Sequence, residues 1–137
     1  DHEGLLLPVI GSFHQADGRF KYVGQQCMAI SLVGIARHMF ESVFSWTTAE
    51  LDKVLLLGDQ LYTDLRYGRR ISGKSKLLCV PDLPRQLTVD GHNFAFVYGD
   101  CVSGHVDVVT GELIDAGVQC PLKCGLQKMC MKYDACF

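Results

Sequence analysis

The stretch GSFHQADGRFKYVGQQCMAISLVGIARH, residues 11–38, decides the fold, because a polar segment turns within it into a long apolar run at Cys27. Glycine and aspartate residues before that point are turn signals and predict an irregular loop. From Cys27 to about Phe44 the apolar residues cover nearly every face of a helical wheel. A helix with that pattern has to be buried on most of its sides, so we predict a central helix over 27–44.

Cys27 falls on the first turn of this predicted helix. Unpaired backbone N–H groups and the helix dipole favour a negative charge there, and the thiolate is the form of cysteine that attacks. In acyl transfer, the backbone N–H of the cysteine and a side-chain amide would hold the oxyanion. Gln15, Gln25 and Gln26 are the nearby amides, and Gln15 is on a separate loop that could lie across a cleft. The alternative is that Cys27 only packs at the start of a buried helix.

A second, amphipathic helix is predicted over 48–66. Thr47 and Glu50 have the spacing of a capping box, and apolar residues recur after them at helical spacing. Three further elements are predicted: strands over 94–100 and 105–113, joined through CVSG, and a third helix over 121–133. The predicted fold class is α/β of the α+β kind, in a single domain over residues 1–137.

Composition limits the classes of function. A chain of 137 residues with 48% hydrophobic and 20% charged residues fits one globular domain. Its formal net charge of -2 provides no broad cationic field, so we expect no nucleic-acid or membrane partner. The longest apolar runs fall far short of the roughly 20 residues that a bilayer span needs. The first residues, DHEGLLLPVIG, lack a methionine and a basic start, so we expect the chain to be part of a larger polypeptide.

The seven cysteines form an odd count without paired spacing: residues 27, 79, 101, 120, 124, 130 and 136. A domain of this size buries a core without disulfides, so we expect free thiols in a reducing, intracellular setting, the cytoplasm or nucleus. The last four cysteines are separated by three, five and five residues, which does not match the short CxxC knuckles of zinc sites. We therefore expect neither a metal nor another cofactor.

Three blocks, GSFHQADGRF, GQQCMAISLVGIA and LDKVLLLGDQLYTDLR, with VPDLP as a fourth, resemble a known family over most of residues 8–110. The family is the deubiquitinating cysteine protease domain of herpesvirus large tegument proteins, with its cellular and mobile-element relatives. The resemblance implies a papain-like fold, in which a nucleophile-bearing central helix packs on a small antiparallel sheet. It implies that Cys27 is the catalytic nucleophile, that Gln15 stabilises the oxyanion, and that the substrates are ubiquitin or polyubiquitin conjugates.

The resemblance also implies a general base in an Asp-x-His arrangement on a late strand. We expect this pair beyond residue 137, so that the fold is incomplete at its C-terminus. His105, with Asp107 two residues on, is the alternative base within the chain. We expect His92, in the turn DGHNF, only to satisfy loop polarity, and His14 to be an exposed loop residue or a substrate contact rather than the base.

Two other functions stay open beside the thiol isopeptidase. One is a non-catalytic remnant of a protease fold that binds ubiquitin or another protein. The other is an α/β domain in which Cys27 is structural. If the chain is an isopeptidase, the glycine-rich tail of ubiquitin needs a narrow groove, and residues 22–26 beside the nucleophile are candidates to line it.

Overall fold

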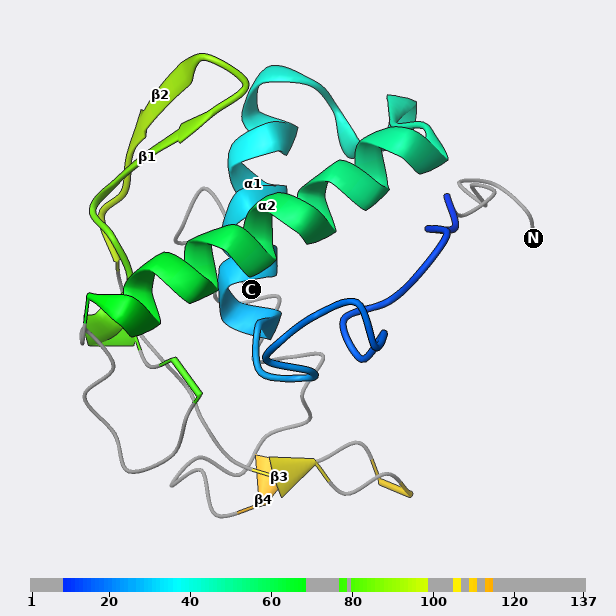
Figure 1. The fold of residues 1–137 in the computed structure, drawn as a ribbon, viewed down its shortest axis with the longest axis vertical. Helices are drawn as coiled ribbons and strands as arrows, with labels where there is room; N and C mark the ends of the chain where they lie inside the picture. The colour runs from blue at the N-terminus through cyan, green and yellow to red at the C-terminus, as the bar shows by residue number, and fades with distance from the viewer. Residues whose placement is uncertain are drawn as a thin grey trace. The chain divides into compact units, whose positions relative to one another are not determined.

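The computed structural model describes residues 9–68, 77–78, 80–98, 105–106, 109–110 and 113–114 (Figure 1). The chain divides into two compact units, Asp1–Phe96 and Val97–Phe137. The first unit holds α1 (Cys27–Phe40), α2 (Thr48–Tyr67), β1 (Gln86–Val89) and β2 (His92–Ala95), with short 3₁₀ helices η1 (Val43–Ser45) and η2 (Val80–Asp82). It is a small α+β unit of two helices and a two-stranded antiparallel sheet, as the predicted class requires. The papain-like fold and the single domain over 1–137 stay predictions.

The central helix α1 begins at Cys27, as predicted, but ends at Phe40, four residues early. The ring nitrogen Nδ1 of His38 accepts a hydrogen bond from the backbone N–H of Val43 at 3.0 Å. Side-chain acceptors of this kind compete with helical hydrogen bonds, which explains why the chain leaves the helix and turns into η1.

Burial on most sides of α1 was also predicted, and this is only partly right. One face is buried, with Ala29, Leu32, Val33, Ala36 and Arg37 on it. Cys27 is exposed, and the side chain of Met39 is 59% exposed. The apolar residues therefore do not mark a helix enclosed on every side; they mark one broad packing face and an accessible first turn.

The helix α2 matches its prediction closely and runs to Tyr67. Its capping box is present, because Thr47 Oγ1 accepts from the Glu50 N–H and the Glu50 carboxylate accepts from the Thr47 N–H. α2 crosses α1 where Gly58 meets Ile30 (Figure 1). Because Gly58 has no side chain, the two helices approach closely at this point.

The strand predicted over 94–100 needs correction. β2 contains only residues 94 and 95 of the predicted strand. It pairs with the preceding strand β1, and Leu87 of β1 lies opposite Phe94 of β2. Asp90 and Gly91 form the two-residue turn between the strands, with φ values of 48° and 79°. Positive φ at both turn residues is the pattern of the tight hairpin turns that Asp-Gly favours.

The core of the first unit lies between α1, α2 and the hairpin. Its buried members are Val33, Ala36, Trp46, Val54 and Val89. The indole N–H of Trp46 donates to the Glu41 carbonyl at 2.8 Å, which holds the α1–α2 junction over this core. α1 is thereby packed against α2 on one side and β1 on the other, and its first turn is fixed in position.

In the second unit, β3 (His105–Val106) pairs antiparallel with β4 (Leu113–Ile114). The single strand predicted over 105–113 is therefore wrong: residues 109–110 form a turn, and the two ends of the segment belong to two strands that pair with each other. The helix predicted over 121–133 and every cysteine except Cys27 lie outside the described residues.

Candidate active site

A cleft of about 340 Å³ opens between the loop before α1 and the two helices. Its lining residues are Gly11, Phe13, His14 and Gln15 from the loop, Cys27, Ile30 and Ser31 from α1, and Leu51 and Leu55 from α2. Aromatic and aliphatic side chains supply most of this lining. Cys27 of α1 and His14 and Gln15 of the loop add a thiol, an imidazole and an amide to this lining, so an apolar cleft carries a few polar groups, as binding sites commonly do.

Cys27 is the first residue of α1 and is exposed. The first intrahelical hydrogen bond runs from the Ile30 N–H to the Gln26 carbonyl at 2.9 Å. The three N–H groups before Ile30 therefore lie at the helix end without an intrahelical acceptor, and no acidic side chain occupies the first turn. Negative charge that develops on the sulfur or beside it is favoured by these N–H groups and by the helix dipole.

Gln15 lines the same cleft as Cys27. The backbone carbonyl oxygen of Gln15 accepts a hydrogen bond from the Gly24 N–H at 3.1 Å. The loop therefore folds back to a point three residues before Cys27. Gly24 adopts φ 73°, a conformation that glycine tolerates without strain. The side-chain oxygen Oε1 of Gln15 is buried and has no hydrogen-bond partner in the described part of the chain. The amide oxygen is therefore not engaged in a structural hydrogen bond, and the group that could donate to an oxyanion is the amide nitrogen Nε2.

Gln26, one of the two alternative amides, is fully buried. Its Nε2 donates to Asp59 at 2.9 Å, and its Oε1 accepts from the Gln25 N–H at 3.0 Å. Gln25 is also occupied, because its Oε1 accepts from the Tyr62 hydroxyl at 2.9 Å and from Arg66 at 3.1 Å. Both amides anchor the start of α1 on α2. Of the three glutamines, Gln15 is the one that lines the cleft, and it is the one that the sequence favoured.

His14 also lines the cleft, and its ring is oriented by the loop itself. Nδ1 accepts from the Ala16 N–H at 3.1 Å, so in this arrangement the proton of the neutral ring is on Nε2. A ring held in that tautomer donates a hydrogen bond from Nε2 rather than accepting a proton there. His14 is an exposed loop residue, as expected, and its part as a substrate contact stays a prediction.

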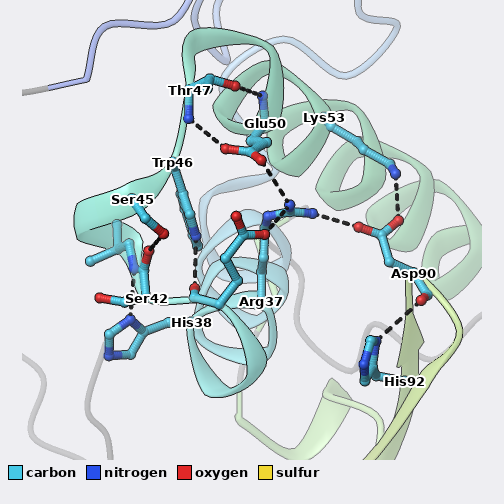
Figure 2. Close-up of polar contacts among 12 residues, drawn as sticks. Arg37, His38, Ser42, Ser45, Trp46, Thr47, Glu50, Lys53, Asp90 and His92 are labelled. Atoms are coloured by element: carbon cyan, nitrogen blue, oxygen red, sulfur yellow. Dashed lines mark hydrogen bonds and ion pairs between the residues drawn. The ribbon is translucent and has the colours of Figure 1, made fainter.

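The sequence contains one Asp-x-His triplet, Asp90-Gly91-His92. The prediction that the Asp-x-His pair lies beyond residue 137 did not take this triplet into account. The structure places this triplet at the β1–β2 turn, at the far end of α1 (Figure 2). The His92 ring stacks on Phe40, the last residue of α1, with 4.1 Å between centroids. Cys27 is the first residue of α1, about 20 Å away along the axis at 1.5 Å per residue. His92 is therefore not placed to take a proton from the thiol.

Asp90 instead belongs to an ion-pair cluster with a structural role (Figure 2). Arg37, whose side chain is 7% exposed, bonds Asp90 and Glu41 and lies 3.6 Å from Glu50, while Lys53 also pairs with Asp90. The hydrogen bond from Lys53, helped by Arg37, lowers the pKa of Asp90. These contacts tie α1, α2 and the hairpin turn together.

A hydrogen bond from the Thr47 backbone, helped by the charge of Arg37, lowers the pKa of Glu50. The capping box of α2 and the Arg37 cluster therefore share one carboxylate. The start of α2 and the end of α1 are fixed by the same group.

The remaining predictions stay open. His105 begins β3 in the second unit, Asp107 lies outside the described residues, and the part of His105 as a base stays a prediction. No group of three metal-binding side chains occurs among the described residues. No helix in the described part of the chain is long and apolar enough to cross a membrane.

A family model for the N-terminal conserved region of herpesvirus tegument proteins matches residues 10–133. The match includes Gln15, Cys27, both helices and the hairpin. It confirms the resemblance to herpesvirus tegument proteins and extends it toward the C-terminus. No curated protein matches the chain.

Proposed function

Since this chain belongs to the herpesvirus tegument protein N-terminal region family, we propose that it is a deubiquitinating thiol isopeptidase with Cys27 as nucleophile. Gln15 and the Cys27 backbone N–H stabilise the oxyanion. The partners are ubiquitin or polyubiquitin conjugates, and the setting is a reducing one, because the reaction needs a free thiol.

The observation that carries the proposal is that one cleft holds an exposed cysteine at a helix start and an amide from a separate loop. Nucleophilic acyl transfer needs a thiolate and donors aimed at the oxygen that becomes charged. The helix N-terminus supplies the environment for the thiolate, and Nε2 of Gln15, which lines the same cleft, supplies the side-chain donor. Gln25 and Gln26 do not serve this purpose, since both are held by α2.

In the proposed reaction, the Cys27 thiolate attacks the carbonyl carbon of the C-terminal glycine of ubiquitin, and the C=O electron pair moves onto oxygen. Collapse of this intermediate re-forms the carbonyl and breaks the C–N bond to the substrate lysine, whose nitrogen takes a proton from the general acid. Water, deprotonated by the same group, then hydrolyses the thioester and releases ubiquitin and the thiolate.

The group that moves these protons is proposed to be an Asp-x-His pair beyond residue 137, with His105 as the alternative in the chain. His92 is excluded by its position at the other end of α1. General acid–base catalysis contributes about 10²- to 10⁴-fold. We therefore compare the 137-residue chain with an enzyme that includes this pair. Lack of the pair should slow isopeptide cleavage strongly and slow the reaction with an activated ubiquitin electrophile less.

The test is covalent labelling by ubiquitin that carries a C-terminal electrophile, followed by mass spectrometry. The wild-type chain should gain the mass of one ubiquitin, Cys27→Ala should gain none, and a Cys79→Ala control should label like wild type. Gln15→Ala should slow labelling, since loss of one oxyanion donor costs about 10²- to 10³-fold in related chemistry.

The same experiment separates the two other functions. Ubiquitin binding without labelling would show that the chain is a binding module rather than an enzyme. Absence of both binding and labelling would leave Cys27 with a structural role only.

A further inference from the structure

We propose that Asp52 of α2 is a positioning residue, which holds the loop of Gln15 across the cleft by accepting the Ser12 backbone N–H. The inference rests on the proposed function of Gln15 and Cys27. Asp52 Oδ1 lies 2.7 Å from the Ser12 nitrogen, and residues 12 and 52 are brought together from separate parts of the chain. Asp52 does not itself line the cleft, so its effect reaches the site through the loop.

The Gln15 segment is short and is held at both ends. Asp52 holds it at Ser12, and the Gly24 N–H holds it at the Gln15 carbonyl at 3.1 Å. In the described part of the chain, the Asp52 contact is the hydrogen bond that links residues 11–15 to α2. Without it, the start of the segment keeps only packing contacts with the helix.

The backbone around Gly11 shows how closely the segment approaches Asp52. A Cβ placed on residue 11 would lie 3.1 Å from Asp52 Oδ1, 3.1 Å from the Phe13 carbonyl oxygen and 3.6 Å from a methyl group of Leu51. A side chain at residue 11 would therefore require the Asp52 carboxylate or the Phe13 carbonyl to shift by a few tenths of an ångström. The glycine therefore allows the Ser12 N–H to reach the carboxylate.

Other contacts of the segment are internal and do not fix it on the helices. The Phe13 ring packs on Phe20, with centroids 5.7 Å apart, and under the Arg19 guanidinium at 3.7 Å. His14 bonds the backbone of Ala16. These contacts join the segment to the rest of the loop, which α2 holds further along through Tyr67 on Lys21 and Tyr62 on Tyr22. Asp52 is the anchor at the start of the segment, on the cleft side of these contacts in the chain. A charge-assisted hydrogen bond of this length is among the stronger ones available for the purpose.

Losing the anchor should cost rate rather than affinity, because the loop would still be present but poorly placed. A misplacement of about 1 Å costs up to about 10²-fold in rate. We expect Asp52→Ala to lower the maximal rate of labelling by the ubiquitin electrophile by roughly tenfold, with little change in half-saturating concentration. Asp52→Asn keeps an oxygen acceptor for the Ser12 N–H and should recover most of the rate.

Asp64→Ala is the matched control. Asp64 is also an acidic residue of α2, but it is exposed and accepts from Gln60 on the same helix. This variant should label like wild type, and thermal melting should show that all variants are folded. A melting temperature lowered equally in Asp52→Ala and Asp52→Asn, with equal loss of rate, would assign Asp52 a general structural role and overturn the inference.

The double variant Asp52→Ala/Gln15→Ala gives the sharpest result. If Asp52 acts through Gln15, the double variant should be no slower than Gln15→Ala, since the loop then carries no oxyanion donor for Asp52 to position. If the two losses multiply, or if Asp52→Ala reacts like wild type, the positioning role is wrong.

Amide hydrogen exchange at Ser12 separates this inference from the proposed function. If the wild-type chain is not labelled at all, the isopeptidase proposal fails, but the anchor is still measured. The Ser12 amide should exchange faster in Asp52→Ala than in wild type and Asp52→Asn. Equal exchange in all three would rule out the anchor.

Discussion

Gly58 of α2 lies directly against the backbone of Ile30 in α1. A Cβ on residue 58 would stand 2.5 Å from the Ile30 Cα and 2.9 Å from its nitrogen, distances that real side chains do not reach. Ile30 also lines the cleft, one helical turn after Cys27. The crossing of the two helices at this point therefore sets the separation of two cleft walls.

Gly58→Ala should destabilise the first unit. Alanine favours a helix over glycine by about 1 kcal/mol, but overpacking costs about 1–3 kcal/mol, and the obstacle is backbone that cannot rotate away. Because the obstacle is backbone, the overpacking cost should lie near its upper end, so a net loss of about 2 kcal/mol in the free energy of unfolding is expected from chemical denaturation. Gly34→Ala is the control, because a Cβ there meets Val54 at 3.8 Å, an ordinary contact. An unchanged or higher stability of Gly58→Ala would contradict the close crossing.

Acidification should weaken the Arg37 cluster. The hydrogen bonds and charges of Lys53 and Arg37 lower the folded-state pKa of Asp90, so this carboxylate adds stability above its unfolded pKa, about 3.9. That contribution is lost as the pH falls from about 4 through the folded pKa. Asp90→Asn removes the charge but keeps the turn, since asparagine also tolerates the φ of 48°.

Denaturation curves from pH 7 down to pH 2 measure this effect. At neutral pH the variant should be less stable than wild type by about 1–2 kcal/mol. The difference should shrink as acid protonates Asp90 in the wild type. A difference that stays constant over that range would show that the charge of Asp90 is not what matters.

The features that the sequence predicted well are those fixed by neighbours in the chain. The capping box of Thr47 and Glu50 needs only residues three apart, and α2 appeared where predicted. The start of α1 at Cys27 is local in the same sense. The hairpin also has a local signal, Asp90-Gly91. The strand over 94–100 was predicted from aromatic and β-branched residues and did not include this signal.

Features that depend on distant partners could not be predicted in the same way. The sequence set Gln15 apart by its separate loop, but it gave no sign that Gln25 and Gln26 are anchors. Their partners, Tyr62 and Asp59, lie more than thirty residues further along the chain. The position of His92 at the far end of α1 likewise depends on how the hairpin packs. Sequence patterns place a residue on an element, whereas its partner is decided by the packing of elements.

The anchor and cleft glutamines should therefore separate experimentally. Gln26→Ala removes a fully buried amide and leaves Asp59 without its 2.9 Å donor, so the free energy of unfolding should fall by about 1–3 kcal/mol. Gln15→Ala should change stability little and labelling strongly. Stability is measured by denaturation and labelling with the ubiquitin electrophile. A stability loss in Gln15→Ala equal to that in Gln26→Ala would mean that Gln15 is structural.

His92→Ala tests the prediction that His92 is not the proton-transfer group. The ring stacks on Phe40 about 20 Å along α1 from Cys27, so isopeptide cleavage and labelling should be unaffected, with only a small loss of stability. A true base contributes about 10²- to 10⁴-fold to turnover, far more than any packing effect at that distance. His105→Ala, measured in parallel, tests the alternative base. A hundredfold loss in His92→Ala with normal melting would show that the hairpin turn reaches the thiol during the reaction.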